Sequence, residues 1–237
     1  MKKKILTLFV FLFAVAVLTG CSNNSAKPNS TGSNTSTGTN TNNNNSNSKS
    51  QQETGANIEK NIKSNGAVTD LGKFIVFVTN ENNVAVDMEI EVEFYDANGT
   101  IVGSDSEDLQ AVGAKADIAI DMWSTPDSFD NYKIYVDAEQ TTKNSYFDKL
   151  ELTHNNNGKE IVAQVKNNSS DTIDYITVSV VYYQGNTVVG YDDNIETDIK
   201  TGRSGNFKLN YPYNKKYKDV QFDSYKVFIN EAYSYNW

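Results

Sequence analysis

The chain has 237 residues, with 30 Asp and Glu against 21 Lys and Arg, and a formal net charge of −9 at pH 7. This acidic balance disfavours a nucleic-acid partner, because phosphate backbones are bound by clustered Lys and Arg. A single Cys excludes an intramolecular disulfide and a multi-cysteine zinc site, and a single His excludes metal motifs built on histidine pairs. We therefore expect no cofactor and no nucleic-acid partner.

The N-terminus has the pattern of a secretion signal over residues 1–20. Three Lys follow Met1, and the apolar run from Ile5 to Val17 is too short for a transmembrane helix but suits a signal peptide. The run leads into Leu18-Thr19-Gly20-Cys21, which resembles a bacterial lipobox. The resemblance implies cleavage before Cys21 and a diacylglycerol group on its sulfur, which would anchor the protein at the extracytoplasmic face of the cell membrane. The alternative is an ordinary signal peptide followed by a chance cysteine.

A polar segment follows the signal. Residues 22–50 contain ten Asn, eight Ser and five Thr, with no aromatic or branched aliphatic side chain. Such a segment buries nothing that could offset the entropy lost on ordering, so the sequence predicts a disordered linker over residues 21–57. The linker would hold the folded part away from the membrane.

The rest of the chain, residues 58–237, contains an internal repeat. Thr100–Asp105 matches Thr187–Asp192, and Phe129–Ile134 matches Phe222–Val227. The short motif that ends in Asn80 also recurs, ending in Asn167. These matches predict two copies of one module, a first repeat over residues 58–140 and a second repeat over residues 141–237.

Each repeat has the pattern of an all-β module. Apolar residues alternate along Met88–Phe94 and along Ile176–Tyr182, which is typical of strands with one buried face. Gly99 and Gly185 fall between strands, where tight hairpins need a positive φ. The sequence therefore predicts two tandem immunoglobulin-like antiparallel β-sandwich domains after the disordered linker. A short helix is expected only over residues 57–64.

The segment Val92-Glu93-Phe94-Tyr95-Asp96, followed by Asn98–Gly103, resembles the FxLYD-type domain. The second repeat supports the resemblance through Val165–Ser169 and Phe222–Val227, although Gln184 stands at the position of the motif Asp. FxLYD-type domains occur in lipoproteins and envelope proteins of Gram-positive bacteria, and the resemblance implies an immunoglobulin-like sandwich. The family has no established catalytic residues, so the resemblance implies a fold and no chemistry.

Acidic residues follow the matching glycines in both repeats. They are Asp105, Glu107 and Asp108 in the first repeat, and Asp192 and Asp193 in the second. Recurring carboxylates of this kind could bind calcium through hard oxygen ligands; the alternative is solvated loop acids, and neither repeat has the dense Asp spacing of a calcium loop. Nothing in the sequence supplies the cleft that a glycosidase pair needs, and His154 lies beside an expected exposed turn. We expect no catalytic residue, and the five acids are only weak calcium candidates.

The outward faces of the two repeats differ. In the first repeat the residues that alternate with the core stripe are acidic, from Asp87 to Glu93, whereas in the second they run from Tyr175 to Tyr183 and include Val181. An exposed face of aromatic and branched residues often marks an interface. The candidate binding surface comprises Tyr175, Val181, Tyr183, Tyr191, Tyr211 and Tyr213. The alternative is that this surface packs against the first repeat.

These observations lead to one expected function and two alternatives. We expect a lipid-anchored, non-enzymatic cell-surface protein that binds an envelope protein or a cell-wall glycan. The first alternative is a structural or accessory envelope lipoprotein that acts as a spacer and has no discrete ligand. An enzyme is the remote alternative.

Overall fold

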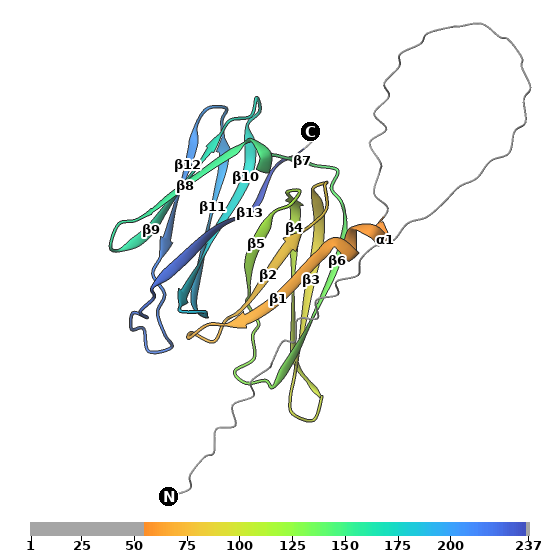
Figure 1. Cartoon of the computed structure of the whole chain (residues 1–237), viewed down its shortest axis with the longest axis vertical. Coiled ribbons are helices and arrows are strands. Elements are labelled where there is room, and N and C mark those ends of the chain that lie inside the picture. The colour runs from red at the N-terminus through yellow and green to blue at the C-terminus, as the bar shows by residue number, and fades with distance from the viewer. Residues whose placement is uncertain (1–54, 236–237) are drawn as a thin grey trace, which may run out of the picture. The chain divides into compact units, whose positions relative to one another are not determined.

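A computed structural model of the chain describes residues 55–235 (Figure 1). The expected signal peptide, Cys21 and the expected linker as far as residue 54 lie outside the described residues. The described part begins with a helical turn, α1 (Gly55–Ile58), continued by the 3-10 turn η1 (Glu59–Asn61). The expected short helix therefore ends at Asn61. None of the helices that the structure describes is long and apolar enough to span a membrane.

Thirteen strands and a second 3-10 turn make up the rest of the described chain. They are β1 (Ile62–Val68), β2 (Phe74–Asn80), β3 (Val86–Tyr95), β4 (Ile101–Val112), β5 (Asp117–Met122), β6 (Asn131–Gln140), β7 (Asn144–Ser145), η2 (Phe147–Lys149), β8 (Leu150–Asn156), β9 (Glu160–Asn167), β10 (Ile173–Gln184), β11 (Thr187–Ile199), β12 (Ser204–Asn210) and β13 (Ser224–Ser234).

The strands form four antiparallel sheets. The first repeat contributes the sheets β1-β2-β5 and β4-β3-β6, and the second contributes β12-β9-β8 and β11-β10-β13-β7. The prediction of an all-β, antiparallel fold is confirmed. The expected boundary between the repeats falls where β6 ends, at Gln140, and the contacts between the repeats join them in one compact unit.

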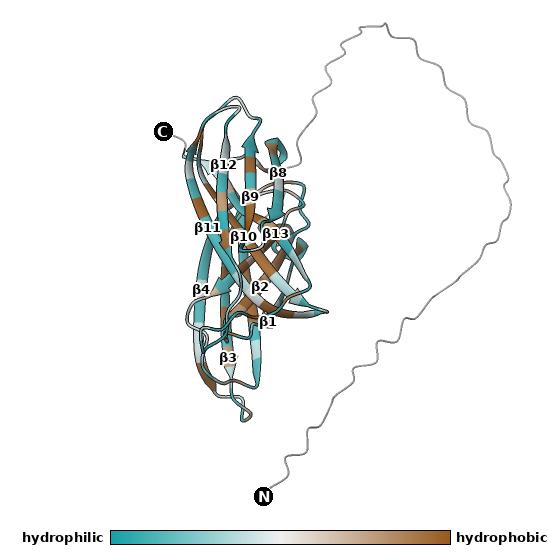
Figure 2. Ribbon diagram, turned by 90° about the vertical axis from the view of Figure 1, so that its left-hand side faces the viewer, coloured by the Kyte–Doolittle hydropathy of each residue, from teal (hydrophilic) through white to brown (hydrophobic). Residues whose placement is uncertain are grey.

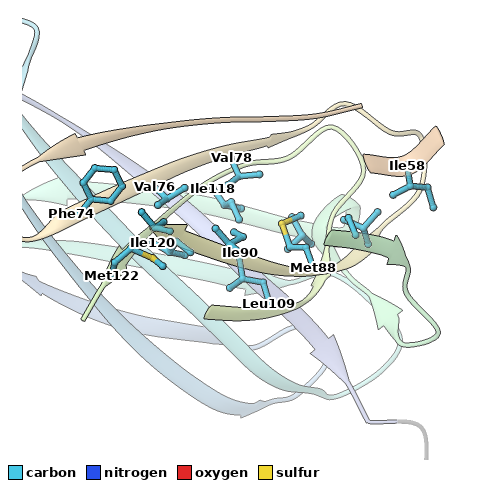
Figure 3. Close-up of a cluster of buried hydrophobic side chains, with 14 of the residues drawn as sticks. Ile58, Phe74, Val76, Val78, Met88, Ile90, Leu109, Ile118, Ile120 and Met122 are labelled. Atoms are coloured by element: carbon cyan, nitrogen blue, oxygen red, sulfur yellow. The ribbon is translucent and has the colours of Figure 1, made fainter. Parts of the chain in front are cut away.

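Each repeat has its own hydrophobic core between its two sheets. In the first repeat Met88, Ile90, Val92 and Phe94 alternate along β3 and are buried, as the sequence predicts. Figure 3 shows such side chains from strands of both sheets meeting in the middle, with Ile58 at one end. The second core forms in the same way around the alternating residues of β10. Full burial of one such aliphatic or aromatic side chain stabilises the fold by about 1.5–3 kcal/mol.

Hydropathy follows burial along the strands. In Figure 2 the hydrophobic residues gather on strands such as β2 and β10, whereas β4 is hydrophilic in its middle, over residues 104–108. The hairpin turns lie where the glycines predict them, with a φ of +79° at Gly99 and +59° at Gly185. An L-residue rarely adopts this left-handed region, so the expected turn positions are confirmed.

The recurring Val-Gly pair has a packing reason. A Cβ on Gly103 would lie 2.7 Å from Cγ of Pro126, and one on Gly190 would lie 2.1 Å from Cβ of Pro212. Pro126, which follows β5, therefore packs directly on Gly103 of the edge strand β4. In the same way Pro212, which follows β12, packs on Gly190 of the edge strand β11. Any larger residue at either glycine would push this loop away.

A buried asparagine closes each repeat at one end. Asn80 donates from Nδ2 to the carbonyl oxygen of Gly113 at 2.8 Å and accepts at Oδ1 from the amide of Asn82 at 3.0 Å. Asn167 donates to the carbonyl of Ile199 at 2.8 Å and accepts from the amide of Ser169 at 2.8 Å. Neither asparagine is exposed. The motif that recurs in the sequence thus satisfies buried backbone groups in loops.

Replacing Asn80 by Ala leaves the Asn82 amide without its acceptor and removes one of the two donors to the Gly113 carbonyl. We expect Asn80→Ala to lower the free energy of unfolding by about 1–3 kcal/mol. Urea denaturation followed by circular dichroism measures the change. The matched control is Asn168→Ala, at an exposed position where the backbone amide, which the substitution keeps, donates to the Lys149 carbonyl, and it should change stability by less than about 0.5 kcal/mol. Equal effects of the two substitutions would contradict the role given to Asn80.

Candidate binding site

The outward face of β10 packs against the first repeat. Val181 and Phe228 of the second repeat form a buried cluster with Ile75 and Ala119 of the first. Tyr183 and Tyr191 pack against the edge of this cluster and are only partly exposed. The sheet β1-β2-β5 therefore faces the sheet β11-β10-β13 across an apolar contact, and the repeats stand side by side (Figure 1).

The polar part of this contact centres on the backbone of Ala119. Asn230 donates from Nδ2 to the Ala119 carbonyl at 2.8 Å and accepts from the Ala119 amide at 3.1 Å. The same carbonyl accepts from Ser179 Oγ at 2.9 Å and from the Tyr191 hydroxyl at 3.3 Å. Asn230 stands at a β-bulge of β13, where the register to β10 shifts, and a bulge turns a side chain away from the regular alternation.

The structure divides the predicted binding surface into parts with different surroundings. Val181, Tyr183 and Tyr191 lie at the contact between the repeats. Tyr175 is partly buried with its ring 5.3 Å from that of Tyr233, and Tyr211 packs on the second core with its ring 5.1 Å from Phe222.

Of the six candidate residues only Tyr213 is exposed, with an exposed fraction of 44%. The six candidate residues therefore do not share one continuous external surface. The physical reason is that the apolar outward face of β10 is covered by the first repeat, which is the alternative that the sequence left open.

The acidic candidates lie in strands rather than in loops. Asp105 on β4 accepts a hydrogen bond from the Ser124 amide at 2.7 Å, and Asp192 on β11 accepts one from the Asn210 amide at 2.6 Å. These equivalent aspartates tie each edge strand to the facing sheet. Among residues 55–235 no group of three or more His, Cys, Asp or Glu could hold a metal ion. His154, expected in a turn, is exposed on β8 beside the ring of Tyr225.

A pocket of about 140 Å³ opens between the two repeats, and we call it the junction pocket. It is lined by Thr69, Leu71 and Lys73 of the first repeat and by Gly190, Tyr191, Asp192, Asn210, Tyr211, Pro212 and Tyr213 of the second. It therefore exists only where the two repeats meet, and it contains three of the tyrosines that the sequence singled out.

Charged groups surround Lys73 in this region. Its ammonium group pairs with Asp121, which is buried, and lies 5.1 Å from the centre of the Trp123 ring. Burial, together with the charges of Asp121 and Asp192, raises the pKa of Asp193 to about 6. Burial also raises the pKa of Asp192, which its hydrogen bonds to Asn210 oppose. The Lys73 ammonium group is thus surrounded by three carboxylates, those of Asp121, Asp192 and Asp193.

Three exposed aromatic side chains lie around the junction, and we call them the aromatic platform: Trp123, Tyr213 and Tyr217. Trp123 is 74% exposed and Tyr217 is 86% exposed. The rings of Tyr213 and Tyr217 are stacked, with their centres 6.0 Å apart and their planes 17° apart. Large aromatic rings left open to water in this way are typical of binding surfaces.

Trp123 is not among the candidate residues that the sequence predicts. The available signal was its position, directly after the apolar strand β5 and before the polar turn Ser124-Thr125. The packing between repeats also had a signal, because Phe74–Val78 is a continuous apolar run, and such a run indicates a strand buried on both faces.

The outward face of β3 belongs to the sheet β4-β3-β6, whose edge strand β4 lies against β13 of the second repeat. Glu89 pairs in register with Asp108 of β4 and Asp137 of β6, so three carboxylates stand in one row. Like charges directly opposite one another destabilise a sheet, so this row favours a solvated face over a buried one.

No family model matches the chain, and no curated protein is similar enough to count as a relative.

Glu231 gives the contact between the repeats a pH dependence. It is buried on β13 and accepts from the amide of Gln110 at 2.7 Å, and its burial raises its pKa to about 7 from the ordinary 4.5. The folded state binds the proton of the Glu231 carboxyl more tightly than the unfolded chain does, so protonation of Glu231 raises the free energy of unfolding. This contribution is complete below pH 4.5 and is lost as the pH rises through 7.

Between pH 4.5 and pH 7 we expect the free energy of unfolding of the Glu231→Gln variant to fall by about 1–3 kcal/mol less than that of the unsubstituted chain. Urea denaturation at several pH values measures the difference between the variant and the unsubstituted chain. Glu151→Gln, at an exposed position of β8, serves as the control and should leave the profile unchanged. Parallel pH profiles for Glu231→Gln and the unsubstituted chain would rule out this role for Glu231.

Asn230 allows a direct test of the coupling between the repeats. Asn230→Ala removes the acceptor for the buried Ala119 amide, and we expect it to lower the free energy of unfolding by about 1–3 kcal/mol. Because each repeat has its own core, we also expect the variant to unfold in two transitions and the unsubstituted chain in one. Calorimetry shows both effects, and Asn155→Ala, at an exposed position of β8, is the control. A variant as stable and as cooperative as the original would contradict this coupling.

Proposed function

We propose that the chain is a lipoprotein of the cell surface, anchored by a lipid on Cys21, that binds an envelope component without catalysing a reaction. Its two repeats would be immunoglobulin-like β-sandwich domains of the FxLYD type. The lipobox-like segment that ends at Cys21 supports the anchor, and the motif shared by the two repeats supports the domain assignment.

Two features of the described residues support the two-sandwich assignment. Each repeat encloses a separate hydrophobic core between two antiparallel sheets. Each repeat also closes one end with an equivalent buried asparagine, Asn80 or Asn167, which holds the same kind of loop. A shared device of this kind is expected when two domains have one architecture.

The aromatic platform is the single observation that carries the binding role. Trp123 and Tyr217 expose most of their rings although the protein buries large apolar groups elsewhere, and they belong to different repeats. Lys73, whose ammonium group lies over the Trp123 ring, also lines the junction pocket together with Tyr213. A partner would therefore contact both repeats at once.

A spacer role remains the second candidate, and one observation favours it. The apolar outward face of β10, which the sequence made the candidate binding surface, is used to hold the two repeats together. A body of two joined repeats on a long linker would suit a structural task in the envelope. The two candidates differ in whether the aromatic platform has a ligand.

Cross-linking on intact cells tests the proposal. We expect the lipidated protein to capture a defined envelope component, and the double substitution Trp123→Ala/Tyr217→Ala to reduce the captured amount at least tenfold, since it removes two exposed aromatic anchors. Mass spectrometry of the cross-linked material measures the capture. Tyr135→Ala is the matched control, because Tyr135 is 46% exposed on β6, at the opposite edge of its sheet from β4, the strand that contacts β13.

Two results would contradict the proposal. Capture that is unchanged in the double variant would favour the spacer role, because the aromatic platform would then have no partner. A Cys21→Ser chain that still fractionates with the membrane would overturn the lipid anchor.

A further inference from the structure

We propose that the junction pocket and the aromatic platform together form a binding site for an uncharged glycan chain. The inference rests on the proposed binding function and names the ligand class of that site. Sugar rings would lie on the faces of Trp123 and Tyr217, and one ring would enter the junction pocket.

The flat faces of the aromatic side chains suit the ligand. A pyranose ring presents one face of C–H groups, and this face packs on an aromatic ring while the hydroxyl groups point to the sides. Trp123 and Tyr217 are 74% and 86% exposed, so the face of each ring that Lys73 or Tyr213 does not cover is open to a sugar ring. Aromatic rings offer a large contact area for few rotatable bonds, so little conformational entropy is lost on binding.

The loop that carries two of the rings, Tyr211–Val220, is held in place before any ligand binds. Asn214 accepts at Oδ1 from the amide of Lys216 at 2.9 Å, and Tyr217 takes a φ of +56° in the same turn. Lys215 pairs with Asp127 of the first repeat at 3.2 Å. A preorganised loop lowers the entropic cost of binding.

The polar groups of the junction pocket suit hydroxyl groups rather than anions. Lys73 offers N–H donors, and Asp192 offers carboxylate oxygens beside the Asn210 side chain. Asp121 and Asp193 lie close enough to interact with each other and with Lys73, so carboxylates outnumber the cation. A negatively charged unit would be repelled from the junction pocket, whereas hydroxyl groups both donate to carboxylates and accept from an ammonium group.

The volume of the pocket also limits the ligand. Pockets for drug-sized molecules measure roughly 300–1,000 Å³, and the junction pocket holds about 140 Å³. It has room for one small polar unit, and the exposed rings of Trp123 and Tyr217 lie outside it. A chain of repeated units would place one unit in the pocket and its neighbours on the rings.

Calorimetric titration of the full lipidated protein in detergent tests the inference. The probes are soluble hexamers of N-acetylglucosamine and of β-linked glucose, with dextran sulfate as the anionic comparison. We expect one of the neutral hexamers to bind and dextran sulfate not to bind. Trp123→Ala should weaken binding at least tenfold and Tyr217→Ala at least threefold. Tyr135→Ala should leave the affinity unchanged.

Three results would overturn the inference: neither neutral hexamer binds at millimolar concentration, dextran sulfate binds as well as the neutral hexamers, or the Trp123 and Tyr217 variants keep full affinity. The inference and the proposed function fail separately. Loss of envelope-protein capture in the double variant, without binding of either hexamer, would keep the binding function and remove the glycan. Hexamer binding without any capture on cells would keep the glycan site and remove the proposed capture of an envelope component.

Discussion

The peptide group of Ala119 is the point on which the arrangement of the two repeats depends. Ala119 lies on β5, an edge strand of its sheet, so its amide and carbonyl have no partner strand on that side. Both groups are buried by the apolar contact between the repeats, and a buried backbone group without a partner is costly. Asn230 and Ser179 supply the missing partners, and the bulge in β13 is what directs Asn230 toward them.

The strands and turns could be predicted from the sequence because they follow local rules. The alternation along Met88–Phe94 and along Ile176–Tyr182 identifies the two core stripes, and both are buried as predicted. Gly99 and Gly185 mark hairpin turns because few other residues tolerate a positive φ there. In each case the physical cause acts within a few residues of the chain, so the pattern and the structure are linked directly.

The candidate site could not be predicted because it depends on which faces meet. The sequence identifies the outward face of β10 as apolar, but an apolar face is equally suited to a partner and to the neighbouring repeat. Only the arrangement of the sheets shows that Val181 is covered by Ile75 and Ala119. The same arrangement brings Lys73 beside Trp123 and Tyr191, although these residues are far apart in the sequence.

The contact between the repeats joins unlike faces, and such a contact could continue from molecule to molecule into a filament. The outward sheet face that each repeat leaves uncovered prevents the growth of such a filament because it is polar. At the register positions of Phe77 and Ala119 the second repeat has Gln164 and Asn206, which hydrogen-bond to each other at 3.0 Å. On the first repeat, the strand equivalent to β10 carries the acidic row around Glu89. Each repeat is therefore apolar on the one face that the other covers and polar on the face that remains in water.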